Sequence, residues 1–289
     1  MKTRTITGLA YALLAVTALL LIRSPMLLCL IVGFSVLAAH EICHAAQIEN
    51  KALIAVSMIV AGIVPPMLEY WTLIRARIHI PAYPLLLGYG IVLLALMLAQ
   101  FEKTRFVHVF FALFASLALP GALTCIVLLR DSMPDKNLAV WLVFFVMCSA
   151  WLTDVFALFT GVKLGKHKMA PRVSPKKTWE GAVGGVAGST LVNIGFALLF
   201  NHFFLENYRI NLLAVVVLSL LVGAASMVGD LAASVLKRNY GVKDFGKFFP
   251  GHGGVMDRFD SLLLAAPFLY ALVQLEQSLG LHLLYEVIS

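Results

Sequence analysis

Charged residues are scarce in this sequence: Asp, Glu, Lys and Arg make up 13% of its 289 residues, while hydrophobic residues make up 61%. Soluble domains average about 25% charged residues. The composition therefore excludes an ordinary soluble domain and indicates a polytopic membrane protein. Cysteine is scarce too. The four cysteines lie in apolar runs without a CxxC pair, which is typical of small buried hydrophobic residues: Cys29, Cys43, Cys125 and Cys148.

Long apolar runs define the fold class. A membrane-spanning helix needs roughly 20 mostly apolar residues, so the sequence predicts an all-α fold of about nine transmembrane helices. Their expected positions are about Ile6–Ile22, Met26–Ala46, Ala52–Ile74, Ile80–Gln100, Val107–Leu129, Leu138–Thr160, Glu180–Phe204, Asn211–Leu236 and Phe259–Leu279. The first run resembles a signal peptide, but no clear small-x-small cleavage site follows, and we interpret it as a span. Pro65-Pro66 and Pro120-Gly121 predict kinks in the third and fifth spans.

Basic residues are distributed unevenly between alternate loops. With the N-terminus inside, most of the 22 basic residues fall in the inner segments, as the positive-inside rule requires. The sequence therefore predicts a cytoplasmic N-terminus and two long cytoplasmic loops, 161–178 and 237–258. Neither loop is long enough for a soluble domain, so any chemistry must use helix ends at the membrane surface. We accordingly divide the chain into N-terminal transmembrane helices, 1–137 with about five spans, and a catalytic transmembrane region, 138–289.

Acidic residues gather at the ends of the eighth and ninth spans. Asp230 lies on a polar stripe of the eighth span, and Asp257 and Asp260 follow at the start of the ninth. A carboxylate there needs a cation. An internal salt bridge from Asp230 to Lys237 or Lys243 is one explanation, and a divalent metal site is the other. We favour the metal because carboxylates without His or Cys partners suit Mg²⁺ better than zinc.

Two inner loops contain phosphate-binding patterns. The segment Pro250-Gly251-His252-Gly253-Gly254 has little side-chain bulk, so its backbone N–H groups can approach a phosphate. In the other loop, Ser174-Pro175-Lys176-Lys177-Thr178 leads into a helix with Glu180 in its first turn, and Ser174 or Thr178 is its expected cap. A helix N-terminus beside lysines binds phosphate readily. For any single lysine, the general excess of positive charge in cytoplasmic loops is the simpler explanation.

Two further motifs have simpler explanations. The segment from His40 to His44 matches H-E-x-x-H, a zinc-protease signature that is short enough to occur by chance. No third ligand occurs in the expected context, and we interpret Glu41 as a buried polar group. Four glycines share one face of the seventh span and predict close helix packing: Gly181, Gly184, Gly185 and Gly188.

The charged stretch resembles a known family. From Ser234 to Asp260 the chain follows the pattern S-x2-K-R-x4-K-D-x-G-x3-P-G-H-G-G-x2-D-R-x-D, which resembles the signature of the phosphatidate cytidylyltransferases, also called CDP-diacylglycerol synthases. The segment from Gly165 to Gly181 is similar to a second block of that family, and Glu41 resembles an acidic residue of its early spans. The resemblance is strongest over residues 153–262. The chain departs from the family after Asp154, where Val155, Phe156 and Leu158 replace a small Ser/Gly run and a tyrosine.

This resemblance implies transfer of a cytidylyl group from CTP to phosphatidate, giving CDP-diacylglycerol and pyrophosphate in phospholipid biosynthesis. It implies a Mg²⁺ cofactor held by Asp230 and Asp257, with a second cation left open. The other implied catalytic residues are Asp260, Asp244 and Lys237. The implied substrate-binding residues are Arg238, Lys243, His252, Gly253, Gly254, Arg258, Ser174, Lys177, Thr178 and Asp154.

The net charge of +7 independently indicates anionic partners. We expect CTP, phosphatidate and the bilayer as partners, and no nucleic acid. The expected location is the inner or plasma membrane, as a multi-pass protein with its active site facing the cytoplasm. A homodimer is one open alternative for the oligomeric state. A CTP-dependent lipid kinase and a cytidylyltransferase for another lipid phosphate are the chemically nearest alternatives, followed by an intramembrane zinc protease and a transporter.

Overall fold

The computed structural model describes residue 22 and residues 24–71, 74, 82–249, 251 and 253–288, and these residues are mostly helical. Within them, six helices are long and apolar enough to cross a membrane, and two shorter apolar helices span Tyr83–Ala99 and Leu262–Ser278. The helical membrane-protein class is therefore confirmed. The first predicted span lies outside the described residues, except for Ile22. The chain forms two compact units, one within Met1–Thr124 and Tyr240–Arg258 and the other within Cys125–Asn239 and Phe259–Ser289.

The first unit contains the second to fourth predicted spans and most of the fifth. Its elements are α2 (Met26–Ala45), α3 (Lys51–Glu69), α5 (Ala82–Ala99), α6 (Phe106–Leu113), the π-helical turn η1 (Phe114–Ala118), the start of α7 (Leu119–Asp131) and the short α11 (Met256–Phe259), whose last residue belongs to the second unit. Asn50 caps α3 by accepting from the Leu53 N–H at 3.1 Å, and its side-chain amide donates to Thr104 Oγ1 at 3.0 Å. One buried side chain therefore ties the start of α3 to the segment before α6.

An irregular turn interrupts the fifth predicted span just before the expected kink. Helix α7 continues through Pro120, whereas the π-helical turn η1 precedes it. A proline ring crowds the carbonyl four residues earlier, which here belongs to Ser116 inside η1. The irregularity therefore falls where Pro120 disturbs the helix, and π turns are a common source of kinks. Helix α3 also continues through Pro65 and Pro66.

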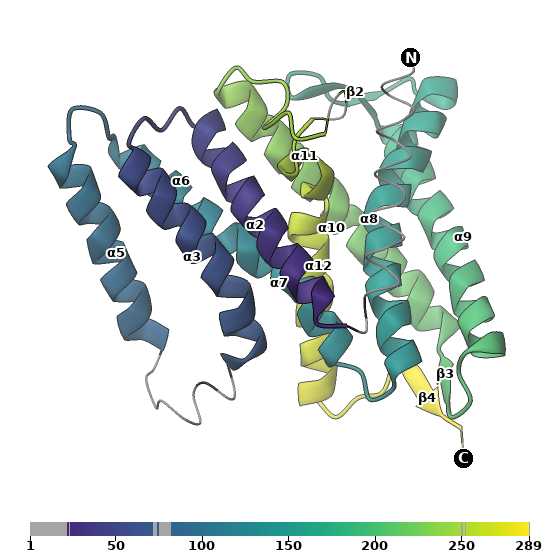
Figure 1. Cartoon of the computed structure of the whole chain (residues 1–289). Helices are drawn as coiled ribbons and strands as arrows, with labels where there is room; N and C mark the ends of the chain where they lie inside the picture. Colours follow the sequence, from purple (N-terminus) through teal and green to yellow (C-terminus); the bar gives the residue numbers. More distant parts are fainter. Residues whose placement is uncertain are drawn as a thin grey trace. The chain divides into compact units, whose positions relative to one another are not determined.

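The second unit contains the helices that carry most of the predicted site. They are α8 (Lys136–Leu164), α9 (Trp179–Phe203), α10 (Leu212–Asn239) and α12 (Leu262–Ser278), and α8, α9 and α10 lie side by side (Figure 1). Trp141, Leu142 and Phe145 of α8 are almost fully buried and form part of its core.

The predicted glycine face of α9 packs closely on α8, as expected. A Cβ atom at Gly185 would lie 2.6 Å from the Thr153 carbonyl oxygen, and one at Gly181 would lie 2.7 Å from the Ala157 carbonyl oxygen. A Cβ atom at Gly188 would meet the Phe156 ring at 2.5 Å. Only glycine permits this approach of the two helices.

Short strands depart from the purely helical prediction. Strand β1 (Lys168–Ala170) pairs with β2 (Ser174–Thr178) in an antiparallel hairpin, and β3 (Tyr208–Ile210) pairs with β4 (Tyr285–Val287) in the same sense. The predicted inner loop 161–178 is thus partly a hairpin. Its strands are short and charged, so they lack the alternation of apolar and polar residues that identifies a strand in a sequence. The functional division at residue 137 stays a prediction.

Candidate active site

The hairpin β1–β2 is joined to α9 through Thr178, one of the two caps expected from the sequence. Its Oγ1 atom accepts from the Gly181 N–H at 3.1 Å, and the residue is only 4% exposed. Glycines at both helix ends lie close to this hydroxyl, since a Cβ atom would lie 2.9 Å from it at Gly161 of α8, 2.7 Å at Gly165 just after α8, and 2.9 Å at Gly181 of α9. Thr178 therefore fixes the hairpin against the ends of α8 and α9.

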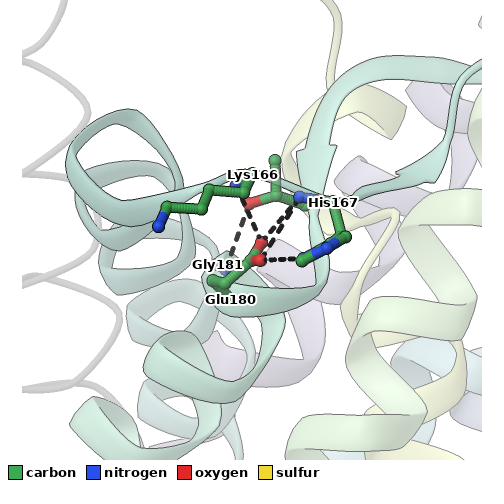
Figure 2. Close-up of polar contacts among 5 residues, drawn as sticks. Lys166, His167, Glu180 and Gly181 are labelled. Carbon is green, nitrogen blue, oxygen red and sulfur yellow. Dashed lines mark hydrogen bonds and ion pairs between the residues drawn. The ribbon is translucent and has the colours of Figure 1, made fainter.

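Glu180 provides a second connection between the end of α8 and the start of α9. Its carboxylate accepts from the backbone N–H groups of Lys166 at 3.1 Å and of His167 at 3.2 Å. The His167 Nδ1 atom lies 2.5 Å from Glu180 Oε1 (Figure 2). Because a carboxylate at the first turn also faces the positive end of the helix dipole, this position suits Glu180. The contacts hold the segment that leads into the hairpin.

A cavity of about 200 Å³ lies between the hairpin and helices α8, α9 and α10. Its polar lining comes from Asp154 of α8, Lys176, Lys177 and Thr178 of the hairpin, and Asp230 of α10. The Lys177 ammonium group forms an ion pair with the Asp230 carboxylate. The remaining lining is apolar: Ala157, Leu158, Met169, Gly181, Ala182 and Met227. A cavity with lysines at one wall and apolar side chains at another fits an anionic group attached to an apolar body.

The Asp230 ion pair was not among the pairs that the sequence suggested. The sequence offered Lys237 or Lys243 as its partner, whereas Lys177 arrives from the hairpin. The Lys237 Nζ atom lies 3.5 Å from Oδ2 of Asp260, and Asp260 is in the turn before α12. Burial, and then the nearby Asp230 carboxylate, raises the pKa of Asp260. The same buried region thus holds several acids that require positive charge.

Arg238, another predicted substrate-binding residue, contacts the hairpin. Its Nε atom donates to the Val173 carbonyl oxygen at 3.1 Å. Ser174, at the start of β2, does not line the cavity. Of the predicted site residues in the second unit, Asp154, Lys177, Thr178 and Asp230 line the cavity.

The remaining predicted residues lie in the first unit, on the glycine-rich segment 240–258. Asp257 is 9% exposed, and its Oδ2 atom accepts from the N–H groups of Phe245 at 2.8 Å and Gly254 at 2.9 Å. Gly253 adopts a positive φ of 85° close to Asp257, which favours glycine there. The Gly254 N–H, which the sequence assigned to a phosphate, thus binds a carboxylate of the chain itself.

Three further predicted residues of this segment differ in exposure. Lys243 and Asp244 are exposed, and Arg258 is half-buried. His252 lies outside the described residues.

The acidic residues fit Mg²⁺ in chemical type. Asp154 and Asp230 line the cavity, and both affect the pKa of Asp260, so three carboxylates share one region of the second unit. Over the part of the chain that the structure describes, no group of three or more His, Cys, Asp or Glu side chains is arranged to hold a metal. Mg²⁺ commonly uses one or two protein carboxylates, with waters and substrate phosphates completing its coordination. The pairing of Asp230 with Asp257 around one ion stays a prediction, since the two belong to different units.

The H-E-x-x-H motif lies on α2, and its glutamate contacts the backbone of the glycine-rich segment. Both carboxylate oxygens of Glu41 accept backbone N–H groups, from Val255 at 3.0 Å and Met256 at 2.9 Å. The rings of His40 and His44 stack with centroids 6.3 Å apart. Glu41 is thus buried and polar, as the sequence suggested, but its partner is the glycine-rich segment. No local pattern could have revealed this contact, because it joins residues more than 200 positions apart.

The described residues thus combine long apolar helices, which are typical of a membrane protein, with a cavity lined by two acids and two lysines. Sequence comparison gives the family: residues 2–276 match the Cytidylyltransferase family. The chain therefore belongs to the Cytidylyltransferase family, which confirms the resemblance found in the charged stretch.

Several relatives are phosphatidate cytidylyltransferases. The chain is 34% identical to the phosphatidate cytidylyltransferase of Rickettsia bellii over 175 residues, which cover 60% of this chain and 74% of the relative. It is 42% identical to that of Haemophilus influenzae over 138 residues, covering 46% of each chain. It is 42% identical to that of Thermotoga maritima over 125 residues, covering 43% of this chain and 46% of the relative.

Proposed function

We propose that this protein transfers a cytidylyl group from CTP to phosphatidate, producing CDP-diacylglycerol and pyrophosphate. The observation that carries the proposal is the cavity where the Lys177–Asp230 ion pair lies beside apolar side chains. A lipid phosphate presents both a charged head and acyl chains, which matches this mixed lining. The names of the relatives supply the nucleotide transfer and the lipid substrate.

The reaction requires two anions to approach each other. An oxygen of the phosphatidate phosphate attacks the α-phosphorus of CTP, a new P–O bond forms, and the bond to the pyrophosphate leaving group breaks. Lys176 and Lys177, which line the cavity, would reduce the repulsion between the reactants once a phosphate replaces Asp230 as the partner of Lys177. Thr178 and the Glu180 contacts keep these lysines in place through the hairpin.

Mg²⁺, when bound, would neutralise phosphate charge and stabilise the developing charge on pyrophosphate. Asp230 and Asp257 are the proposed ligands, with Asp260 and Asp244 as additional acids and a second cation left open. Lys237, Arg238, Lys243 and Arg258 are proposed to hold triphosphate or lipid phosphate. Ser174, His252, Gly253 and Gly254 complete the proposed substrate contacts, with Asp154 at the cavity wall.

The membrane arrangement extends the same proposal. About nine spans with a cytoplasmic N-terminus would place the hairpin and the glycine-rich segment on the cytoplasmic side of the inner or plasma membrane, where CTP is available. Phosphatidate would enter sideways, with its acyl chains remaining in the bilayer. A homodimer stays a prediction of the sequence.

Product analysis with purified protein tests this function. With CTP, Mg²⁺ and phosphatidate we expect CDP-diacylglycerol and pyrophosphate in equal amounts. Release of CDP with phosphorylation of a lipid alcohol would indicate a kinase instead. A folded Asp257→Asn protein that keeps full CTP-dependent activity would remove Asp257 from the proposed metal ligands, without affecting the reaction assignment.

A further inference from the structure

Glu41 makes an unusual contact for an acidic residue inside an apolar helix. It lies near the end of α2 and is 7% exposed. Its Oε1 atom accepts from the Val255 N–H at 3.0 Å, and its Oε2 atom accepts from the Met256 N–H at 2.9 Å. Both oxygens are therefore used by two consecutive amides of the glycine-rich segment. Such bonds offset part of the cost of burying a carboxylate.

At two positions of the segment, the Glu41 side chain leaves room only for glycine. A Cβ atom at Gly246 would lie 2.1 Å from Glu41 Oε1, and one at Gly254 would lie 2.4 Å from both carboxylate oxygens. Neither residue is among the positive-φ glycines of the described chain, in contrast to Gly251 and Gly253. A positive φ therefore does not explain the glycines at positions 246 and 254. The need for glycine there comes from the volume that Glu41 occupies.

The same stretch of backbone also holds Asp257. The Gly254 N–H donates to Asp257 Oδ2, while the next two N–H groups donate to Glu41. Two carboxylates thus share three consecutive amides, so the position of one side chain restricts the other. The Phe245 N–H donates to the same Asp257 oxygen, so the Gly254 and Phe245 amides together orient the Asp257 carboxylate, and Glu41 holds the backbone on the Gly254 side.

We infer that Glu41 is a positioning residue for the reaction: from α2 it anchors the backbone of residues 254–256 and thereby orients Asp257. Its role in catalysis rests on the proposed function, whereas the anchoring itself does not. Glu41 would act through the segment, because both of its carboxylate oxygens already accept backbone N–H groups. Its negative charge is required because each of its two oxygens must accept a bond, which an amide side chain cannot do with both of its polar atoms.

Hydrogen exchange of the full-length protein in detergent tests the anchoring. In Glu41→Gln we expect the Val255 and Met256 amides to exchange about tenfold faster or more, because a hydrogen bond to a charged acceptor is lost. Exchange in α3 and α5 should stay unchanged. Gly33→Ala is the matched control on the same helix, since a Cβ atom there meets nothing within 4 Å. Unchanged exchange at residues 254–256, or an equal increase throughout the unit, would overturn the inference.

A double-mutant cycle tests the contact itself. Gly246→Ala alone should accelerate exchange at residues 254–256 about as strongly as Glu41→Ala, since the new methyl group displaces the carboxylate. In the Glu41→Ala background, Gly246→Ala should add little, because residues in contact are not additive. Fully additive effects would contradict the inference.

Turnover supplies the catalytic readout. If the wild type forms CDP-diacylglycerol, Glu41→Gln should lower kcat about tenfold or more and change the KM for CTP less. The reason is that the Asp257 carboxylate would no longer be held in the orientation that the transition state requires. An unchanged kcat alongside faster exchange would remove the catalytic role. If the wild type forms no CDP-lipid, the proposed function fails, and the exchange measurements still decide whether Glu41 anchors the segment.

Discussion

The close packing of α8 and α9 predicts a large difference between two glycine substitutions on the same helix. In Gly185→Ala the new methyl would lie 2.6 Å from the Thr153 carbonyl oxygen and 2.8 Å from Ala157 Cβ. The first distance is 0.8 Å shorter than the 3.4 Å at which ordinary contact begins. Because these two atoms belong to a backbone carbonyl and a short side chain, the helices themselves must move. Overpacking of this kind costs about 1–3 kcal/mol.

Gly195→Ala is the matched control, because a Cβ atom there meets nothing within 4 Å. It should be neutral or stabilising by up to about 1 kcal/mol through helix propensity. For a chain of this size, about 1 kcal/mol corresponds to roughly 2–4 °C, so Gly185→Ala should lower the Tm in detergent by several degrees. CTP turnover should fall with it, since α8 carries Asp154 of the cavity. Equal Tm values for the two variants would refute the packing argument.

Three further predictions concern the cavity and its supports. Replacing Lys177 with Met and Asp230 with Asn, singly and together, should give a coupling free energy of about 0.5–3 kcal/mol in thermal unfolding; additive losses would show that the ion pair contributes nothing. Thr178→Ala should destabilise the protein by about 0.5–2 kcal/mol, whereas Thr178→Ser should retain most of the cap, and equal Tm values for the two would contradict a capping role. Chelation of divalent cations should abolish turnover and added Mg²⁺ should restore it, because carboxylates suit this ion; full activity in chelator would exclude the metal.

The sequence predicted the long helices well because hydrophobic length is a strong local signal. The expected span Met26–Ala46 corresponds to α2, Met26–Ala45, and the expected span Glu180–Phe204 corresponds to α9, Trp179–Phe203. The predicted start of the ninth span was less accurate. The chain breaks there into two helices, because α11 ends at Phe259 and α12 begins at Leu262. The Ser261 N–H donates to Asp260 Oδ1 at 2.9 Å in this break. A local side-chain bond of this type competes with the helix, and hydrophobicity does not reveal it.

In the candidate site, one local contact was predictable from the sequence, whereas the contacts between distant segments were not. Thr178 was an expected cap because capping depends on neighbouring residues. The Lys177–Asp230 ion pair and the Glu41 anchor join segments that are distant in the sequence, so only the fold reveals them. The sequence around Glu41 also allowed a second interpretation, because the residue lies inside an H-E-x-x-H motif that is typical of zinc proteases. The sequence did offer one clue to a role for Glu41, because this residue resembles an acidic residue in the early spans of the family.

The position of isotopic label in the products tests the central claim most directly. Purified protein would be incubated with phosphatidate, Mg²⁺ and CTP labelled at either the α- or the γ-phosphate. Cytidylyl transfer predicts that the α-label enters the lipid and that the γ-label is recovered in pyrophosphate. Recovery of the γ-label in lipid, or no label in lipid from either nucleotide, would contradict the proposed reaction.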